Sequence, residues 1–285
     1  MTMKLKKVYL EISNVCNRSC AFCPGTTREA HFMDLEHFKI AAREVKTVSD
    51  FVYFHVMGEP LLHSELADML DYCQSIGLKV IITTNGTLLK QKESVLLEAK
   101  ALHKINISLH SFEANCKQQE SYFEQCFSFA KKASECGKIS VLRLWNLDGD
   151  LPGMNKENDR VISQMKDFFA TEWQENTKGY RIANRLFLEW GSRFTWPDMN
   201  LPVLRENGSC YGLRDQAAIL CDGTVVPCCL DKNGDIPLGN VFEAPLLQIL
   251  CADRASSVKN GFLCGRYTEQ LCKRCGYAGR FSTKN

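Results

Sequence analysis

The first two hundred residues alternate short apolar runs with longer amphipathic stretches. Six runs have the composition and alternation typical of β-strands: residues 7–13, 51–57, 79–86, 104–110, 139–146 and 185–191. Helical spacing of apolar residues occupies the intervals: residues 34–46, 64–77, 88–100, 112–136 and a segment that ends near 171. Ser64 is a candidate N-cap, and Gly77 is a candidate helix stop.

Repeated strand–helix units predict an α/β fold with a parallel sheet, here a barrel-like arrangement of six repeats. In parallel barrels, functional residues lie on the loops that follow the carboxyl ends of the strands. The loop after the first strand contains three cysteines within residues 13–25. We therefore expect these cysteines at the functional edge of the sheet.

The composition changes after residue 200. The remaining residues hold eight of the 15 cysteines, several glycine-containing turns and one convincing helix, at 244–255. Such a segment is typical of a small domain organised by metal. We predict a barrel domain over 1–204 and a metal-organised domain over 205–285.

Charge and the N-terminal sequence limit the possible function classes. The 35 Lys and Arg nearly balance the 33 Asp and Glu, and no long basic block is present, so nucleic-acid binding has no electrostatic support. The N-terminus has no secretory h-region, and no apolar run is long enough to span a membrane. We expect a cytoplasmic protein, whose clustered cysteines are metal ligands or catalytic groups rather than disulfides.

The thiols of Cys16, Cys20 and Cys23 occupy one short loop. A 4Fe-4S cluster has four irons, so three thiolates leave one iron open for a substrate or cofactor. A zinc site that takes its fourth ligand from elsewhere, such as His31, is the alternative. A disulfide is disfavoured, because it would close a very small ring.

This loop resembles the signature of the radical S-adenosylmethionine (AdoMet) enzymes. The spacing Cys16-x3-Cys20-x2-Cys23 follows a first strand, and the aromatic Phe22 precedes the third cysteine. The family also has a Gly-Gly-Glu motif after the second strand, which holds the AdoMet amino group. Here Met57, Gly58 and Glu59 occupy that place, with Met57 replacing the first glycine.

The resemblance assigns further AdoMet contacts to the ends of the next strands. Thr84 and Asn85 follow the third strand near the cofactor, Ser108 on the fourth strand would contact the ribose, and Arg143 on the fifth would bind the carboxylate. Each has a structural alternative: Asn85-Gly86 is also an ordinary turn sequence, and an arginine is most often solvated or ion-paired. Their occurrence on successive strands supports the cofactor interpretation.

The C-terminal cysteines resemble the Twitch domain, a shorter relative of the SPASM domain. That resemblance implies four ligands of an auxiliary 4Fe-4S cluster: Cys210, Cys228, Cys272 and Cys275. A zinc ribbon is the alternative. Because successive side chains of a strand point to opposite faces, we expect Cys229 to point away from Cys228. Cys221, Cys229 and Cys264 are candidate hydrogen-atom donors.

The implied fold is a partial (β/α)6 TIM-like barrel followed by a small Twitch/SPASM-type domain. The implied chemistry is reductive cleavage of AdoMet to a 5'-deoxyadenosyl radical, which abstracts a hydrogen atom from a substrate. We expect a small-molecule or peptide substrate and a reducing electron donor such as flavodoxin or ferredoxin, with no nucleic-acid or membrane partner. The first strand starts within ten residues of Met1, which disfavours a leader-binding N-terminal domain.

The sixth strand offers candidate substrate contacts, Glu189, Trp190, Arg193 and Trp196. The aromatic residues among them could equally seal the barrel against the second domain. Two-electron oxidation is the favoured reaction, because a fully ligated auxiliary cluster can accept an electron but cannot bind substrate. The alternatives are a peptide epimerase with a cysteine hydrogen donor, and a zinc- or iron-sulfur-binding interaction protein without enzymatic activity.

Overall fold

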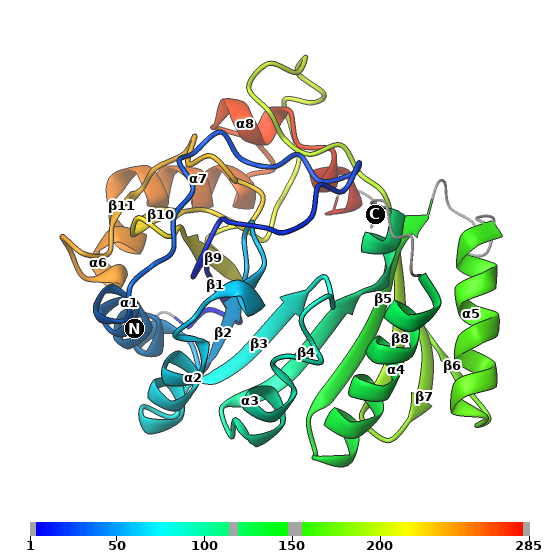
Figure 1. Ribbon diagram of the computed structural model, residues 1–285. Coiled ribbons are helices and arrows are strands. Elements are labelled where there is room, and N and C mark those ends of the chain that lie inside the picture. The colour runs from blue at the N-terminus through cyan, green and yellow to red at the C-terminus, as the bar shows by residue number, and fades with distance from the viewer. Residues whose placement is uncertain (1–3, 114–118, 148–155, 282–285) are drawn as a thin grey trace.

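The computed structural model describes residues 4–113, 119–147 and 156–281, and its described strands form one eleven-stranded sheet (Figure 1). Six consecutive strands of the barrel run parallel to one another, as predicted. They are β1 (Lys7–Leu10), β2 (Phe51–Phe54), β3 (Lys79–Thr84), β4 (Leu102–Ser108), β5 (Ile139–Leu147) and β8 (Leu186–Ser192). The sheet order β1-β2-β3-β4-β5-β8 confirms the partial (β/α)6 barrel.

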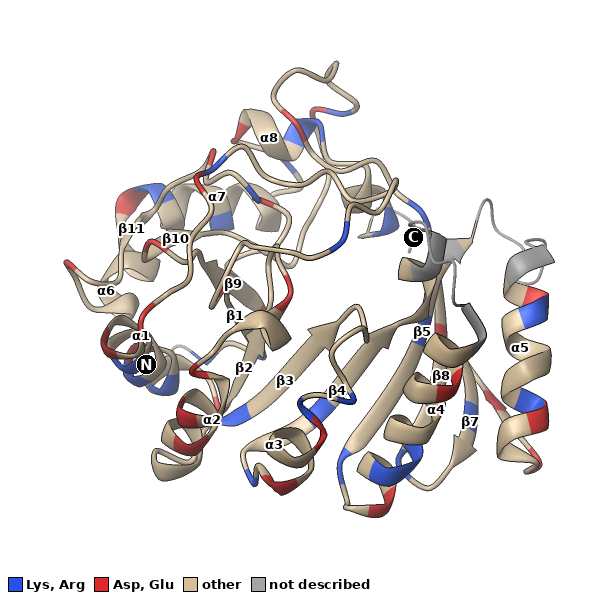
Figure 2. Cartoon of the chain, viewed as in Figure 1, with Lys and Arg blue, Asp and Glu red and all other residues tan. Residues whose placement is uncertain are grey.

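Helices that alternate with these strands cover the outer face of the sheet (Figure 1). They are α1 (Leu35–Val48), α2 (Leu66–Ser75), α3 (Glu93–Glu98), α4 (Gln119–Glu135) and α5 (Lys156–Phe169). The Asp34 side chain caps α1 by accepting a hydrogen bond from the His37 N–H. The predicted N-cap Ser64 is wrong, since α2 starts after Glu65 with no side-chain capping bond. Figure 2 shows that acidic and basic residues are interspersed along these helices.

The two faces of the barrel strands differ in their environment. Val52 and Phe54 of β2 are fully buried in the core between sheet and helices. Tyr53, which points to the opposite face, is partly exposed. Glu189 of β8 is also partly exposed, next to the fully buried Leu188. The inner face of the barrel, called the lumen below, is therefore accessible to solvent at these positions.

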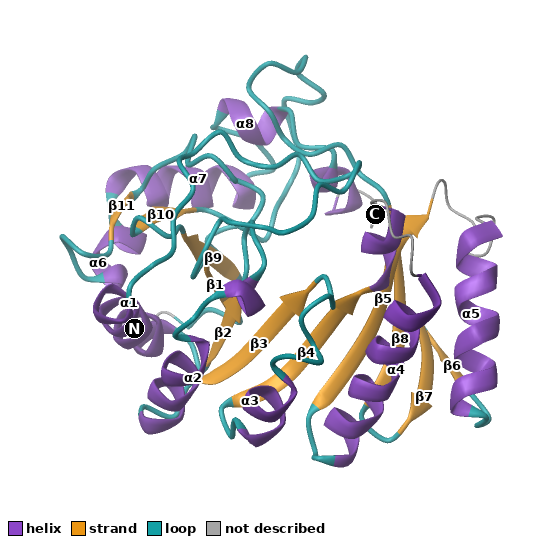
Figure 3. Ribbon diagram, in the orientation of Figure 1, coloured by secondary structure: helices purple, strands orange, loops and turns teal. Residues whose placement is uncertain are grey.

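The C-terminal region extends the same sheet. Strand β9 (Gln216–Ile219) pairs in parallel with β1, and β10 (Thr224–Val226) and β11 (Gly239–Asn240) follow in antiparallel pairing. Figure 3 shows that loops make up most of this region. The domain boundary expected near residue 204 stays a prediction. The two parts share one hydrogen-bonded sheet and one hydrophobic core, so the structure has no separate sheet or core on each side of that residue.

Two features differ from the sequence-based expectation. The predicted helix at 244–255 is two helices, α6 (Leu246–Cys251) and α7 (Asp253–Leu263), because Ala252 between them is extended. A hairpin of β6 (Gln174–Asn176) and β7 (Gly179–Ala183) precedes β8 and was not predicted. Its first strand is fully exposed, so it lacks the apolar alternation that identifies a strand.

The remaining short elements lie at the functional edge or in the C-terminal region. They are η1 (Pro60–Leu62), η2 (Leu109–Glu113), α8 (Gln270–Lys273) and η3 (Tyr277–Phe281). Among the described helices, none is long and apolar enough to cross a membrane.

Candidate functional site

The loop that follows β1 crosses above the carboxyl ends of the barrel strands (Figure 1, blue). Cys16 and Cys23 are exposed, Cys20 is half-buried, and none of the three forms a disulfide. A turn, in which the Cys23 N–H donates to the Cys20 carbonyl at 3.0 Å, keeps the second and third cysteines together. The Asn85 amide donates to the Cys16 sulfur at 3.8 Å. Three cysteine thiols on one loop, one of them held by an amide donor, fit a cluster with one open iron.

Gly58 lets the end of β2 approach the cysteine loop closely. Its φ is +75°, and a Cβ atom there would lie 2.4 Å from the Ser13 carbonyl oxygen and 2.9 Å from that of Val15. The adjacent Glu59 N–H donates to the Val15 carbonyl at 2.8 Å. Only glycine satisfies both the left-handed backbone and the close contact. The position of the cysteine loop therefore depends on Gly58.

Replacing Gly58 with Ala should destabilise the protein by about 3 kcal/mol or more, because the left-handed backbone and the collision both cost free energy. Gly137→Ala is the matched control, since Gly137 has φ +79° and no heavy atom within 4 Å of the position that a Cβ would take. The control should lose only about 1 kcal/mol. Denaturant unfolding of the metal-free proteins measures both, and equal losses would show that the close approach at Gly58 is unimportant.

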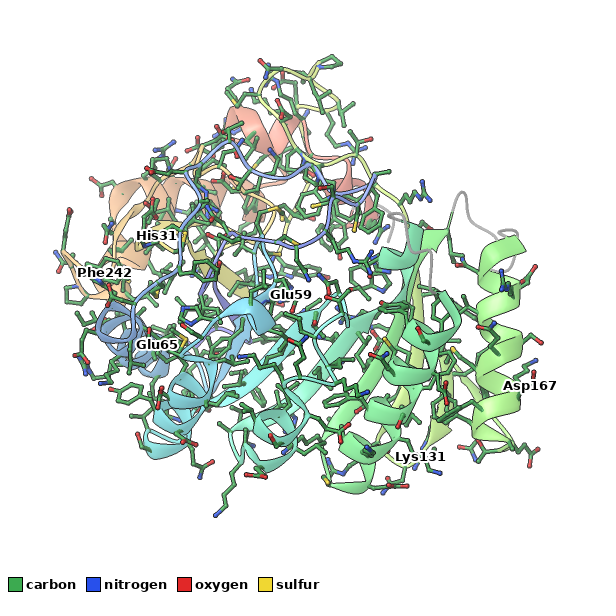
Figure 4. The ribbon with its side chains drawn as sticks, in the orientation of Figure 1. His31, Glu59, Glu65, Lys131, Asp167 and Phe242 are labelled. Atoms are coloured by element: carbon green, nitrogen blue, oxygen red, sulfur yellow. The ribbon has the colours of Figure 1, made fainter. Side chains whose placement is uncertain are left out.

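The Glu59 carboxylate is buried beneath the loop (Figure 4). One oxygen accepts hydrogen bonds from Thr84 Oγ1 at 2.7 Å and the Leu61 N–H at 3.0 Å, and the other accepts from the Asn85 N–H at 2.7 Å. Burial raises the pKa of Glu59 to about 7, although these three donors oppose the shift. Glu59 thus joins the ends of β2 and β3, and its contact with the AdoMet amino group stays a prediction.

Ser108, Arg143 and Glu189 lie side by side on β4, β5 and β8. The register pairs Ser108 with Arg143 and Arg143 with Glu189. Arg143 Nε lies 3.7 Å from Glu189 Oε2, and Lys104 Nζ lies 3.9 Å from Glu189 Oε1. Phe22 packs its ring against His110 in η2, with ring centroids 4.8 Å apart. The structure brings these predicted contacts to one edge of the sheet.

Several polar atoms facing the lumen are buried without a hydrogen-bond partner. Among the described side chains, these include His55 Nδ1, Asn106 Oδ1 and Trp145 Nε1. The Arg143 guanidinium also lies over the Trp145 ring, 4.7 Å from its centroid. An unpaired buried polar atom costs about 1–3 kcal/mol, so a group of them on neighbouring strands indicates a place for polar ligand atoms.

The predicted substrate contacts do not all face this lumen. Trp190 follows Glu189 on β8 and points to the opposite face, where it packs against Tyr180 with centroids 5.3 Å apart. Trp196 packs against Phe194 in the loop after β8, and Arg193 is exposed. Of the four, Glu189 is the residue placed beside Arg143.

The four C-terminal thiols predicted to bind a cluster share one cavity, whose lining includes Cys210, Cys228, Cys272 and Cys275. Burial raises the pKa values of Cys228, Cys272 and Cys275, and the neighbouring thiols raise them further. The cavity lining also contains Pro197, Tyr267 and Tyr277. Four thiols that line one cavity fit the donor set of a fully ligated 4Fe-4S cluster.

The remaining candidate thiols lie in three different surroundings. Cys229 packs in a second apolar cluster with Tyr9, Tyr53 and Val56, and its thiol is hydrogen-bonded to the Tyr9 hydroxyl. Cys221 is buried beneath the cysteine loop, whereas Cys264 is exposed at the end of α7. Cys229 therefore points toward the barrel, away from the cavity that Cys228 lines.

The zinc alternative with His31 has no geometric support in the described residues. His31 is exposed on the side of the loop away from Glu59 (Figure 4). Within residues 4–113, 119–147 and 156–281, no three His, Cys, Asp or Glu side chains are placed to hold a single metal ion. The thiolates of a cube bind four different irons, so they lie farther apart than the ligands of one ion.

Several polar residues that the structure places near the site were not predicted from the sequence. His55 and Asn106 face the lumen, and Glu11 and Arg28 form a buried ion pair beside the cysteine loop. A signal was available, because polar residues interrupt apolar strand segments at alternate positions, as in the first strand with Tyr9 and Glu11. Arg28 had no such signal, since it lies in an irregular loop.

Comparison with known proteins identifies two domains. The radical SAM superfamily matches residues 10–167, which is more than half of the chain. The iron-sulfur cluster-binding domain called SPASM matches residues 210–276. Together these domains imply 4Fe-4S clusters and AdoMet as cofactors, which confirms the predicted cofactors.

Individual relatives are distant. The chain is 30% identical over 170 residues to an uncharacterized protein of Methanocaldococcus jannaschii, covering 57% of this chain and 54% of the relative. It is 23% identical over 279 residues to the S-adenosyl-L-methionine-dependent 2-deoxy-scyllo-inosamine dehydrogenase of Niallia circulans, covering 94% and 91%. Several curated relatives are matched over only about a third to a half of their length.

The fold is similar to that of Streptococcus suis SuiB bound to the precursor peptide SuiA. The TM-score is 0.62 at 17% identity, covering 97% of this chain and 70% of SuiB. This similarity agrees with the barrel, and the two matched domains agree with the cysteine patterns. The chain belongs to the radical SAM superfamily and carries an iron-sulfur cluster-binding SPASM domain in its C-terminal part.

Proposed function

We propose that this protein cleaves AdoMet reductively, abstracts a hydrogen atom from a small polar molecule and completes a two-electron oxidation. When bound, AdoMet and the first cluster supply the 5'-deoxyadenosyl radical, and the auxiliary cluster supplies an acceptor for one electron. The thiols of Cys16, Cys20 and Cys23 would hold the first cluster. The electron donor would be a small reducing protein such as flavodoxin or ferredoxin.

The protein's own residues position the cofactor and the substrate. Gly58 and Asn85 set the cysteine loop above the strands, and Ser108 and Arg143 are proposed to contact AdoMet at their ends. The unpartnered His55 and Asn106 atoms in the lumen would bind polar groups of the substrate. A dehydrogenation also releases a proton, for which the partly exposed Glu189 carboxylate is the proposed acceptor.

The observation that carries the oxidation is the arrangement of the C-terminal thiols. All four, Cys210, Cys228, Cys272 and Cys275, line one cavity, so a cube held there would have a thiolate on every iron. Such a cube suits electron transfer rather than substrate binding. The relative that aligns over 94% of this chain is named an AdoMet-dependent dehydrogenase, which supports the same reaction class.

Glu189→Gln is expected to slow substrate oxidation about 100-fold, because it removes the proposed proton acceptor. AdoMet cleavage without substrate should persist. Trp190→Phe is the matched control, because Trp190 is the next residue on the strand and its side chain points to the opposite face. This variant should oxidise substrate at about the rate of the unsubstituted protein. Mass spectrometry of small-molecule extracts, incubated with reconstituted protein and reductant, should find a product lighter by two hydrogen atoms. Equal activity of both variants would remove Glu189 from the reaction.

Epimerisation is the second candidate, because Cys229 points toward the barrel beside Tyr9. Its thiol could return a hydrogen atom to a substrate carbon radical, leaving a thiyl radical that needs an electron and a proton to recover. In heavy water this reaction would add one deuterium to the product, and Cys229→Ala would abolish that incorporation. Cys264→Ala is the control, since Cys264 is exposed at the end of α7. Deuterium incorporation that depends on Cys229 would show that the reaction is epimerisation and not oxidation.

A further inference from the structure

A buried ion pair links the cysteine loop to both parts of the chain. The Glu11 side chain, at the end of the first strand, is completely buried, and the Arg28 side chain is 13% exposed. Arg28 Nη2 lies 2.7 Å from both carboxylate oxygens of Glu11. Burial opposes the charge of Arg28, but the Glu11 carboxylate raises the pKa of Arg28 above its ordinary value. Arg28 therefore keeps its positive charge inside the protein, beside Glu11.

Glu11 uses its remaining acceptor capacity on two backbone groups from distant segments. The Met57 N–H donates to Glu11 Oε1 at 3.0 Å, and the Cys221 N–H donates to Glu11 Oε2 at 3.1 Å. Met57 precedes Gly58 in the segment proposed to hold the AdoMet amino group, and Cys221 follows β9 in the C-terminal region. One carboxylate thus fixes two peptide groups that belong to different domains.

Arg28 extends the same connection through its other nitrogens. Its Nε donates to the Lys232 carbonyl at 2.9 Å, and its Nη1 donates to the Cys221 sulfur at 3.4 Å. Thr26, three residues after Cys23, also donates to the Lys232 carbonyl, at 3.1 Å. Lys232 lies four residues after Cys228 in the sequence. A short path of bonds therefore connects the loop of the first cysteine triad to the segment of Cys228.

We propose that Glu11 and Arg28, called the clamp here, are positioning residues for AdoMet: they hold the Met57 peptide and fix the C-terminal region against it. The clamp spans β1, the cysteine loop, the Met57 peptide and the Cys221–Lys232 segment. Lysine cannot replace Arg28, because one ammonium group cannot contact the Glu11 carboxylate, the Lys232 carbonyl and the Cys221 sulfur together, as the three guanidinium nitrogens do. This inference rests on the proposed AdoMet-binding role of the Met57–Glu59 segment.

The test measures AdoMet binding by equilibrium dialysis of the reconstituted full-length protein without reductant. Glu11→Gln should raise the AdoMet Kd about tenfold, because the amide leaves Arg28 without its ionic partner and one backbone N–H without an acceptor. Iron content should stay unchanged. Arg28→Lys should raise the Kd as well, by a smaller factor, since it keeps the charge beside Glu11 and loses the contacts of Nε and Nη1 with Lys232 and Cys221.

Glu44→Gln is the matched control. The Glu44 carboxylate also joins the two parts of the chain, because it accepts a hydrogen bond from the Leu246 N–H at 2.8 Å, but it lies on the outer helix α1. Its AdoMet Kd should not change. Hydrogen exchange of the metal-free proteins gives a second readout: the Met57 amide should lose protection in Glu11→Gln and keep it in Glu44→Gln.

The outcomes separate this inference from the proposed function. If Glu11→Gln and Arg28→Lys lower thermal stability but leave the AdoMet Kd unchanged, the clamp is merely structural and the inference is wrong. If Glu11→Gln does not fold, an unchanged Kd in Arg28→Lys equally contradicts the inference. If Gly58→Ala, once folded, also binds AdoMet normally, the AdoMet-binding role of the Met57–Glu59 segment is wrong instead.

Discussion

Replacing Cys16, Cys20 and Cys23 together with Ala is expected to reduce 5'-deoxyadenosine formation to the rate without protein. The physical reason is that these three cysteine thiols occupy one loop above the strand ends, where Asn85 holds the first of them. Without them no iron is presented to AdoMet. Chromatographic measurement of 5'-deoxyadenosine after reconstitution and reduction provides the test.

The same triple variant should keep roughly four irons, the number in one cube, because the four C-terminal thiols are untouched. It should also keep its fold, since Cys16 and Cys23 are exposed and Cys20 is only half-buried. Iron analysis and circular dichroism check these two points. Continued release of 5'-deoxyadenosine under a strong reductant would show that the cysteine loop does not carry the radical chemistry.

The second large effect is expected at Cys228. In the protein that already lacks the first cysteine triad, Cys228→Ala should lose or degrade the remaining roughly four irons. Cys228 lines the same cavity as Cys210, Cys272 and Cys275, so its removal leaves one corner of a cube without a thiolate. The measurement is iron content together with the visible absorption of the cluster.

Cys229→Ala is the matched control, one residue further along the chain. Its thiol lies beside Tyr9 and Tyr53 in a separate apolar cluster, so the iron content should stay unchanged. An essential Cys229 with a dispensable Cys228 would contradict the ligand assignment. It would also mean that the segment after β10 is placed one residue out of register.

Much of the fold could be predicted because its signals are local. Apolar runs bounded by polar turns located the six parallel strands, and helical spacing located α1, α2, α4 and α5. The predicted helix start at Asp34 was confirmed. Its signal is local, because the Asp34 side chain accepts a hydrogen bond from the backbone N–H of His37, three residues later. The hairpin of β6 and β7 was missed, because its pairing depends on β8 rather than on its own composition.

The candidate cluster ligands were also predictable, because the spacing of the cysteine residues can be read from the sequence. The strand alternation further predicted that Cys228 and Cys229 point apart, and the structure shows their different surroundings. The roles of these ligands and of the AdoMet contacts stay predictions. The superfamily and its cofactors are confirmed by the domain matches.

The sequence by itself determined the strand–helix order, the two cysteine patterns and the superfamily, since each depends on residues close together in the chain. Only the tertiary structure decided which side chains share a site. It joined Glu11 and Arg28 to Met57 and Cys221. The physical reason is that these contacts form between segments up to about two hundred residues apart, through strand register and burial, which no local pattern specifies.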